Sequence, residues 1–294
     1  MLDAVQCRGN PKIKHYILAV RVIYPIPCVH TGIECSEGYR CTAGLCPLLW
    51  QDLANLPELG GFAVYRWEIA GSLTLVFTLL AYRLHGVTGS GAIAGAVNCF
   101  VLYMGAGAAA FAALITVFFL TWTTTWLRYE RKQNLGTAEQ REGRTASQVL
   151  ANLGTATACA ALYGFNQDKK VLLLALAAAL SEAAADTVSS EVGQAFAEKA
   201  RLITNWSRVP AGTNGAVSLR GTLSGIAAAI IVSTVGAVSG LVPPQWLAIS
   251  VGAAILGMLI DSLLGATLER RLLNNDAVNF LSTLVAALAS LWLA

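Results

Sequence analysis

Apolar runs of about twenty residues recur from Trp67 to the C-terminus of this 294-residue chain. A run of that length crosses about 30 Å of hydrocarbon as an α-helix, which rises about 1.5 Å per residue. Charged residues make up 13% of the sequence, whereas they make up about 25% of an ordinary soluble domain. The chain is therefore predicted to be a membrane protein. We count eight spans, over residues 67–82, 89–106, 108–127, 146–164, 171–195, 221–241, 245–268 and 276–294.

Several of these runs are rich in alanine and glycine rather than leucine. Small side chains let helix backbones approach closely, so the runs are expected to pack tightly against one another. The predicted fold class is all-α: a polytopic transmembrane helix bundle of about eight spans with small-residue packing. Residues 66–294 are expected to form one membrane domain.

The first sixty-five residues do not follow this pattern and are predicted to form a separate extension. They hold five of the seven cysteines, Cys7, Cys28, Cys35, Cys41 and Cys46. Outside the cell these could form disulfides. A zinc site is the weaker alternative because no pair of CxxC motifs is present, and a poorly ordered extension is the third. The other two cysteines, Cys99 and Cys159, are expected to be small packing residues.

The basic residues predict which loops share a side of the membrane, because Lys and Arg accumulate in short cytoplasmic loops. The loops after the first, third, fifth and seventh runs hold twelve of them, whereas the alternate loops hold only Lys169 and Lys170. The loops near 128–144, 197–220 and 269–275 are therefore expected in the cytoplasm. The predicted localisation is a multi-pass integral membrane protein whose polar site faces the cytoplasm, where nucleotides are.

Carboxylates interrupt two of the apolar runs. Glu182 and Asp186 are spaced by four and share one helical face, which Ser189 or Ser190 continues. Glu191 follows them, and Asp261 lies in the seventh run. Ionised side chains are costly at bilayer depth, so they are expected to face a protein interior or a wet cavity. Mg²⁺ is commonly held by one or two carboxylates plus substrate phosphates, which makes Asp186 and Asp261 candidate metal ligands. The alternatives are a capped helix end and a helix-packing seam.

A glycine-rich loop, Gly212-Thr213-Asn214-Gly215, leads into the sixth run past Ser218, Arg220 and Thr222. Backbone N–H groups in such a turn, followed by a helix N-terminus, favour anions such as phosphate. The loop is not a Walker A motif, because no GxxxxGK[ST] is present. An ordinary connector between two helices is the alternative.

Two further polar groups lie where the fourth and eighth runs begin. Arg144, Gln148 and Asn152 are successive residues of one helical face. Asn275, Asp276 and Asn279 open the eighth run, where they serve either as helix caps or in substrate binding.

These polar groups, in this order, resemble the DUF92 family, also called TMEM19-like, over about 210 residues. Five motifs carry the resemblance: Gly143-Arg144 with Gln148 to Asn152; Asp186-Thr-x-x-Ser190-Glu191-x-Gly193; Pro210-x-Gly212-Thr213-x-Gly215-x-x-Ser218-x-x-Gly221-Thr222; Asp261-Ser262-x-x-Gly265-x-Thr267; and Asn275-Asp276-x-Val-Asn279. The cysteine-rich start of the chain has no counterpart in the family.

The resemblance implies a membrane kinase, because the characterised plant members are phytyl-phosphate kinases. Such an enzyme transfers the γ-phosphate of a nucleoside triphosphate, preferentially CTP, to an isoprenoid monophosphate. Its partners would be membrane lipids and these two substrates, with Mg²⁺ as cofactor, without nucleic acid and with no oligomeric state implied. The alternatives are a cytidylyltransferase that forms a CDP-lipid and an ion-coupled transporter.

The resemblance also implies a role for each matching residue. Asp186 would be the leading metal ligand with Glu191 in support, and Asp261 would hold a second metal position. Neither helical position nor motif singles out Glu182 or Glu269. Nucleotide or phosphate binding would fall to Arg144, Gln148, Asn152, Ser190, Thr213, Asn214, Gly215, Ser218, Arg220, Thr222 and Asn279.

Overall fold

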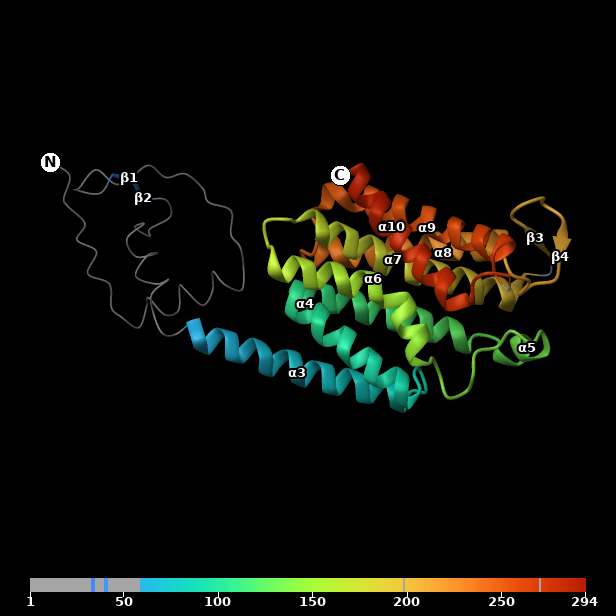
Figure 1. The fold of residues 1–294 in the computed structure, drawn as a ribbon, viewed down its shortest axis with the longest axis horizontal. Coiled ribbons are helices and arrows are strands. Elements are labelled where there is room, and N and C mark those ends of the chain that lie inside the picture. The colour runs from blue at the N-terminus through green and yellow to red at the C-terminus, as the bar shows by residue number, and fades with distance from the viewer. Residues whose placement is uncertain (1–32, 35–39, 42–58, 198, 270) are drawn as a thin grey trace. The chain divides into compact units, whose positions relative to one another are not determined.

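Long α-helices make up most of the described chain in the computed structural model (Figure 1). The structure describes residues 33–34, 40–41, 59–197, 199–269 and 271–294, with side chains from Tyr65 onward. The helices are α3 (Leu59–Arg83), α4 (Gly89–Trp126), α5 (Tyr129–Asn134), α6 (Ala146–Phe165), α7 (Val171–Phe196), α8 (Leu219–Val238), α9 (Leu247–Thr267) and α10 (Asn275–Leu293), with a 3₁₀ turn, η1 (Pro244–Trp246), before α9.

Residues 1–64 and 65–294 form two separate units. In the first unit, β1 (Ile33–Glu34) pairs antiparallel with β2 (Arg40–Cys41). Cys7, Cys28, Cys35 and Cys46 lie outside the described residues, so the disulfide and zinc alternatives stay predictions. In the second unit, Cys99 and Cys159 are free and buried in one apolar cluster, which confirms that they are packing residues.

A reversal at Gly107 divides α4 into two halves, residues 89–106 and 108–126. Gly107 has φ 79° and ψ −168°, a conformation that glycine adopts without the steric cost of a Cβ atom. Near the end of α4, Trp122 Nε1 donates a hydrogen bond to the carbonyl oxygen of Leu84, which precedes the helix (3.0 Å). A straight helix of 38 residues would hold its ends about 57 Å apart. The two halves of α4 therefore fold back on each other as a helical hairpin.

The most buried helix of the bundle is α7, against which α4, α6, α8, α9 and α10 all pack. Its residues 174–185 are buried without interruption, and all of them except Ser181 and Glu182 are apolar, as expected for a helix surrounded by others. A Cβ atom at Gly225 of α8 would lie 2.7 Å from the carbonyl oxygen of Ala185, so the approach of α8 to α7 requires glycine there. This is the small-residue packing that the sequence predicts.

The connections that follow α3, α4, α7 and α9 gather at one end of the bundle. Figure 1 shows α5 and the small sheet at this end, with the α6–α7 turn and the C-terminus at the other. Hydrogen bonds to backbone carbonyl groups tie the connections together: Thr88 N–H donates to the Arg144 carbonyl oxygen (3.0 Å), and the Arg131 guanidinium donates to the carbonyl oxygen of Ala197 (2.9 Å). These are the loops that the basic residues predicted to share one side.

The connection between α7 and α8 forms a three-stranded antiparallel sheet, which departs from the predicted all-α fold. Its central strand β3 (Ala200–Leu202) pairs with β4 (Arg208–Val209) and β5 (Ala216–Val217). Strands of two or three residues are too short to show an alternating pattern, so the sequence gives no sign of them.

Among the described residues, five helices are long and apolar enough to cross a membrane: α4, α7, α8, η1 with α9, and α10. The prediction of about eight spans is therefore not confirmed. The hairpin α4 counts once in this tally. The other two long helices, α3 and α6, are not among the five; α3 carries Arg66, Glu68 and Arg83, and α6 carries Gln148 and Asn152.

Candidate active site

A polar pocket opens among the helix ends that meet at the loop-rich end of the bundle. It takes side chains from α6, α7, α9 and α10 and from the connection between α4 and α6. Its lining residues are Glu139, Arg144, Gln148, Asn152, Asp186, Thr187, Ser190, Glu191, Asp261, Asn275 and Asn279.

The polar pocket brings together eight of the fourteen predicted site residues. The spacing of four places Asp186 and Ser190 of α7 on the same wall, as it does Gln148 and Asn152 of α6. The eight are Arg144, Gln148, Asn152, Asp186, Ser190, Glu191, Asp261 and Asn279. Their functional roles stay predictions, but their convergence from four helices is a property of the fold.

Asp186 and Asp261 lie side by side, although they come from different helices. The Oδ2 atom of Asp261 is buried and accepts no hydrogen bond from the described residues. Glu182, which the sequence did not single out, lies one turn deeper on α7, next to both aspartates and only 1% exposed. Glu182 precedes Asp186 by four residues, and this spacing could have identified it as a member of the same helical face.

These carboxylates fit a Mg²⁺ ion that is shared with a substrate. Among the described residues, no three Asp, Glu, His or Cys side chains are arranged to hold one metal ion. A Mg²⁺ site of one or two carboxylates completed by phosphate oxygens needs no third protein ligand. The unpaired Asp261 Oδ2 atom is an oxygen of the kind that such an ion binds.

Glu191 is held in a buried ion pair with Lys132 of α5. The Lys132 ammonium, 0% exposed, donates to Glu191 Oε2 (2.5 Å) and to the carbonyl oxygens of Thr124 (3.0 Å) and Thr125 (2.5 Å). The Thr125 hydroxyl donates to the other oxygen, Glu191 Oε1 (3.1 Å). All three ammonium protons are therefore used. The sequence predicts Lys132 only as one of the basic loop residues, and the ion pair gives Glu191 a structural role in addition to its predicted place beside Asp186.

Arg144 brings the positive charge to the polar pocket. Its backbone is fixed by hydrogen bonds to the 86–88 segment, and its guanidinium Nη1 lies 3.5 Å from Thr187 Oγ1 on α7. Because Lys132 neutralises Glu191, the pocket's other acids, Glu139, Asp186 and Asp261, face one guanidinium. A phosphate would be repelled there unless a cation accompanied it, which again favours a divalent metal.

Gln148 links the start of α6 to Glu139, a pocket residue that the sequence analysis missed. Gln148 Oε1 accepts from the backbone N–H of Thr145 (2.7 Å) in a capping box. Gln148 Nε2 donates to both carboxylate oxygens of Glu139 (3.3 and 3.2 Å). Glu139 comes from a connection without periodicity, so only its proximity to Arg144 in the sequence pointed to it.

At the start of α10, one asparagine caps the helix and two others line the polar pocket. Asn274 is the N-cap, since its side chain accepts from the backbone N–H of Ala277 (2.9 Å). Asn275 and Asn279 are not needed as caps, and both line the polar pocket. Capping is therefore the role of Asn274, and not of Asn275 or Asn279.

The other six predicted residues, from the glycine loop and the start of α8, do not line the polar pocket. Several of them make local hydrogen bonds instead. Ser218 caps α8 by accepting from Gly221 N–H (3.1 Å), the Thr213 hydroxyl donates to the Pro210 carbonyl oxygen (2.9 Å), and Arg220 donates to the Phe196 carbonyl oxygen (3.0 Å). The six are Thr213, Asn214, Gly215, Ser218, Arg220 and Thr222. Their predicted phosphate binding stays a prediction.

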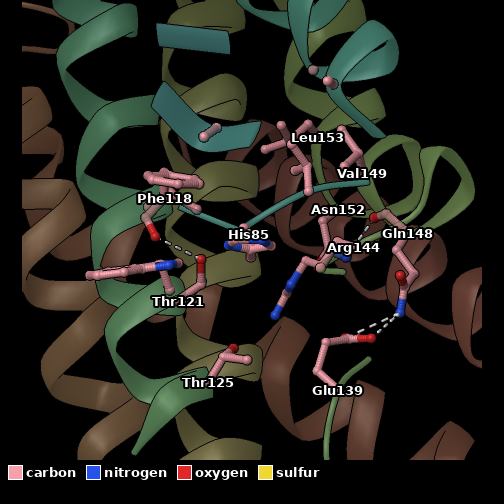
Figure 2. Close-up of a pocket in the computed structure, with 18 of the residues that line it drawn as sticks. His85, Phe118, Thr121, Thr125, Glu139, Arg144, Gln148, Val149, Asn152 and Leu153 are labelled. Carbon is pink, nitrogen blue, oxygen red and sulfur yellow. Dashed lines mark hydrogen bonds between the residues drawn. The ribbon is translucent and has the colours of Figure 1, made fainter. Parts of the chain in front are cut away.

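An apolar pocket adjoins the polar pocket and shares four of its residues, Glu139, Arg144, Gln148 and Asn152. Its walls come mainly from α3, both halves of α4 and α6. Figure 2 shows Phe118, Thr121, Val149 and Leu153 around this space, with Arg144 and the hydrogen-bonded Glu139–Gln148 pair at its polar rim. The apolar pocket is an open cleft, and all the space out to its open mouth amounts to about 920 Å³.

The chain matches the family described as "Integral membrane protein DUF92" over residues 72–287. It belongs to this family. The resemblance predicted from the five motifs is confirmed, and the matched region contains every residue of both pockets.

Three relatives illustrate the range of the DUF92 family. An uncharacterized membrane protein of Synechocystis is 33% identical over 192 residues, 64% of this chain and 74% of the relative. Protein VTE6, chloroplastic, of Arabidopsis thaliana is 28% identical over 236 residues, which are 76% of this chain and 71% of the relative. An uncharacterized membrane protein of Methanocaldococcus jannaschii is 31% identical over 218 residues, which are 72% of this chain and 88% of the relative. No solved structure matches the chain significantly.

Proposed function

We propose that this chain is a membrane kinase that transfers the γ-phosphate of a nucleoside triphosphate, preferentially CTP, to an isoprenoid monophosphate. The observation that carries the proposal is the junction of the two pockets. An isoprenyl phosphate has an anionic head on an apolar chain, and the polar and apolar pockets share a rim of four residues at which such a molecule fits. The family resemblance supplies the isoprenoid and the nucleotide.

The polar pocket would position the reacting phosphates. Asp186 and Asp261 would hold Mg²⁺, which neutralises phosphate oxygens when bound. Arg144 would bind the head of the lipid at the rim, and Asn279 and Ser190 would donate hydrogen bonds to nucleotide phosphates. Positioning and charge neutralisation provide most of the catalysis of phosphoryl transfer.

The reaction balances without a covalent enzyme intermediate. An oxygen of the lipid monophosphate forms a bond to the γ-phosphorus, and the bond from that phosphorus to the β–γ bridging oxygen breaks. The products are the lipid diphosphate and a nucleoside diphosphate. Because a phosphate monoester is already anionic at pH 7, the attacking oxygen needs no strong general base, which agrees with a polar pocket whose described lining contains no histidine.

The membrane arrangement is part of the proposal: eight segments cross the bilayer, α4 crosses twice because it turns at Gly107, and the polar pocket faces the cytoplasm. The twelve basic residues in loops at one end of the bundle support this orientation. An epitope inserted after Gly136 is expected on the cytoplasmic side, and one inserted after Asp168 on the opposite side. The same sidedness for both insertions would contradict the arrangement.

Two alternatives differ from the kinase in their products. A cytidylyltransferase would attack the α-phosphorus and release pyrophosphate, whereas the kinase releases CDP. An ion-coupled transporter would move substrate across sealed vesicles without nucleotide turnover, and an apolar pocket joined to the acidic pocket favours a lipid substrate over an ion alone.

The test uses the purified chain in lipid nanodiscs with phytyl or geranylgeranyl monophosphate, Mg²⁺ and each of the common nucleoside triphosphates. Mass spectrometry should find the isoprenyl diphosphate together with a nucleoside diphosphate. Omission of Mg²⁺ should abolish both. Absence of diphosphate with every pair of substrates would overturn the kinase, and pyrophosphate with a CDP-lipid would establish the cytidylyltransferase.

A further inference from the structure

The apolar pocket has a polar end and an apolar end. Seven residues of the second half of α4 line it, between Leu114 and Trp126, which are about 18 Å apart along the helix. Trp126 lies near the connection that carries Glu139 and Arg144, so this end adjoins the polar pocket. On α3 and α4 the lining residues furthest from the loops are Phe77 and Leu114. These two side chains form the far end.

Phe77 packs against two other aromatic rings at this far end. Its ring makes edge-on contacts with the rings of Phe111 (5.7 Å between centroids) and Phe118 (5.2 Å). Leu114 beside it is 4% exposed and belongs to the main apolar cluster of the bundle. A chain that enters from the polar rim therefore meets packed side chains rather than a second opening at this point.

The side wall contains a gap that a larger side chain would fill. Gly95, in the first half of α4, lines the apolar pocket, and a Cβ atom built on it would have no other heavy atom within 4 Å. Its backbone is helical, so a larger side chain there brings no backbone strain. The width of the pocket at this level depends on the absence of a side chain.

We propose that the apolar pocket receives the isoprenoid chain of the substrate, and that Phe77 at its far end and Gly95 at its side determine which chains fit. The proposal rests on the proposed function, since the phosphate head at the shared rim fixes the direction in which the chain enters. Phe77 limits chain length, and Gly95 provides the width for the methyl branches.

Two variants alter the pocket in opposite ways. Phe77→Ala extends it, and a few added carbon atoms in an apolar pocket change selectivity by about 10-fold or more. We expect the kcat/KM ratio of geranylgeranyl over farnesyl monophosphate to rise about 10-fold. Gly95→Leu narrows the pocket for every branched chain, and kcat/KM should fall about 10-fold with both substrates. Replacing a helical glycine also favours folding, so this variant keeps the test valid if Phe77→Ala proves unstable.

Matched controls lie on the outer surface of the same helices. Phe119→Ala removes an aromatic ring that is 40% exposed and does not line the pocket. Gly71→Leu fills another open position on α3, where a Cβ atom would also meet no heavy atom within 4 Å. Both should leave kcat/KM and the chain-length ratio unchanged within about 2-fold. An equal shift in the controls would overturn the proposal.

A photoreactive group at the far end of a geranylgeranyl monophosphate gives a readout that does not need turnover. In the wild-type protein, crosslinks should map to peptides that contain Phe77 and Leu114, and Gly95→Leu should abolish them. If diphosphate forms but neither kcat/KM, nor the ratio, nor the crosslinks respond to the two variants, the chain lies elsewhere and the kinase stands. If no diphosphate forms but these crosslinks appear, the apolar pocket binds the isoprenoid and the kinase fails.

Discussion

The polar pocket and the glycine loop begin as equal candidates in the sequence and differ in the structure. Both carry small polar residues beside an ionisable one, and both lie at the same end of the bundle. The pocket residues face one another across four helices. Each region keeps a buried polar atom without a hydrogen-bond partner among the described residues, Asp261 Oδ2 in the pocket and Asn214 Nδ2 in the loop. In the loop, Ser218 and Thr213 direct their side chains to neighbouring backbone groups.

The difference follows from what surrounds each polar group. Inside a helix the backbone is satisfied, so a side chain such as Asp186 must find its partner on another helix. In a turn, backbone N–H and C=O groups are free, and Ser and Thr satisfy them locally. Polar residues within helices are therefore the stronger indication of a functional site. The following predictions test whether the polar pocket matters more for turnover than the glycine loop.

The largest effect is expected from Asp186→Asn. If Asp186 binds Mg²⁺ as proposed, loss of its charge should lower kcat by about 1,000-fold, with little change in stability because the side chain keeps its shape. Turnover is measured by diphosphate formation, with size-exclusion chromatography as the check of folding. Near-normal turnover would show that Asp186 does not act in the reaction, and the polar pocket would no longer be the preferred candidate for the active site.

The second largest effect is expected from Lys132→Met, which should lower the stability of the folded protein. It leaves the Glu191 carboxylate buried without its cation, which costs about 3–5 kcal/mol in the free energy of unfolding and lowers Tm. The double variant Lys132→Met/Glu191→Leu removes both charges and should recover most of the loss. If the recovered protein turns over normally, Glu191 has no direct part in the chemistry, and its role is to hold α5 against α7.

A smaller loss is expected from Asn279→Ala, in which a hydrogen bond to phosphate disappears. Turnover should fall about 10-fold while Tm hardly changes. Asn274→Ala, five residues earlier, removes the α10 cap and should lower stability by about 1 kcal/mol with kcat and KM preserved. Reversed results would mean that the cap, and not the pocket residue, contacts the substrate.

The smallest effects are expected in the glycine loop. Ser218→Ala should cost about 1 kcal/mol as a lost helix cap, and Thr213→Val less. The KM for the nucleotide should stay within about 2-fold of wild type in both variants. A KM that rises 10-fold or more would show that the loop binds the triphosphate, as the family resemblance first suggested, and would end the contrast between the two regions.

Most of the pocket could be predicted because regular helices translate spacing into position. Asp186 and Ser190, or Gln148 and Asn152, are four residues apart and had to share a wall. Lys132 and Glu139 could not be found in this way, because the connection that carries them has no period from which to infer where a side chain ends. The same holds for β3 to β5 and for the choice of Asn274 over Asn275 as the cap, which depends on where the helix begins to within one residue.

The reversal at Gly107 brings α4 back to the end of the bundle from which it starts. Removing residues 89–126 would therefore leave every later helix in its original direction, whereas removing a helix that runs from one end of the bundle to the other would invert them. Much of the apolar wall belongs to α4, while Asp186 and Asp261 lie on α7 and α9. A lineage could therefore exchange much of the apolar wall and keep the two aspartates on their original helices.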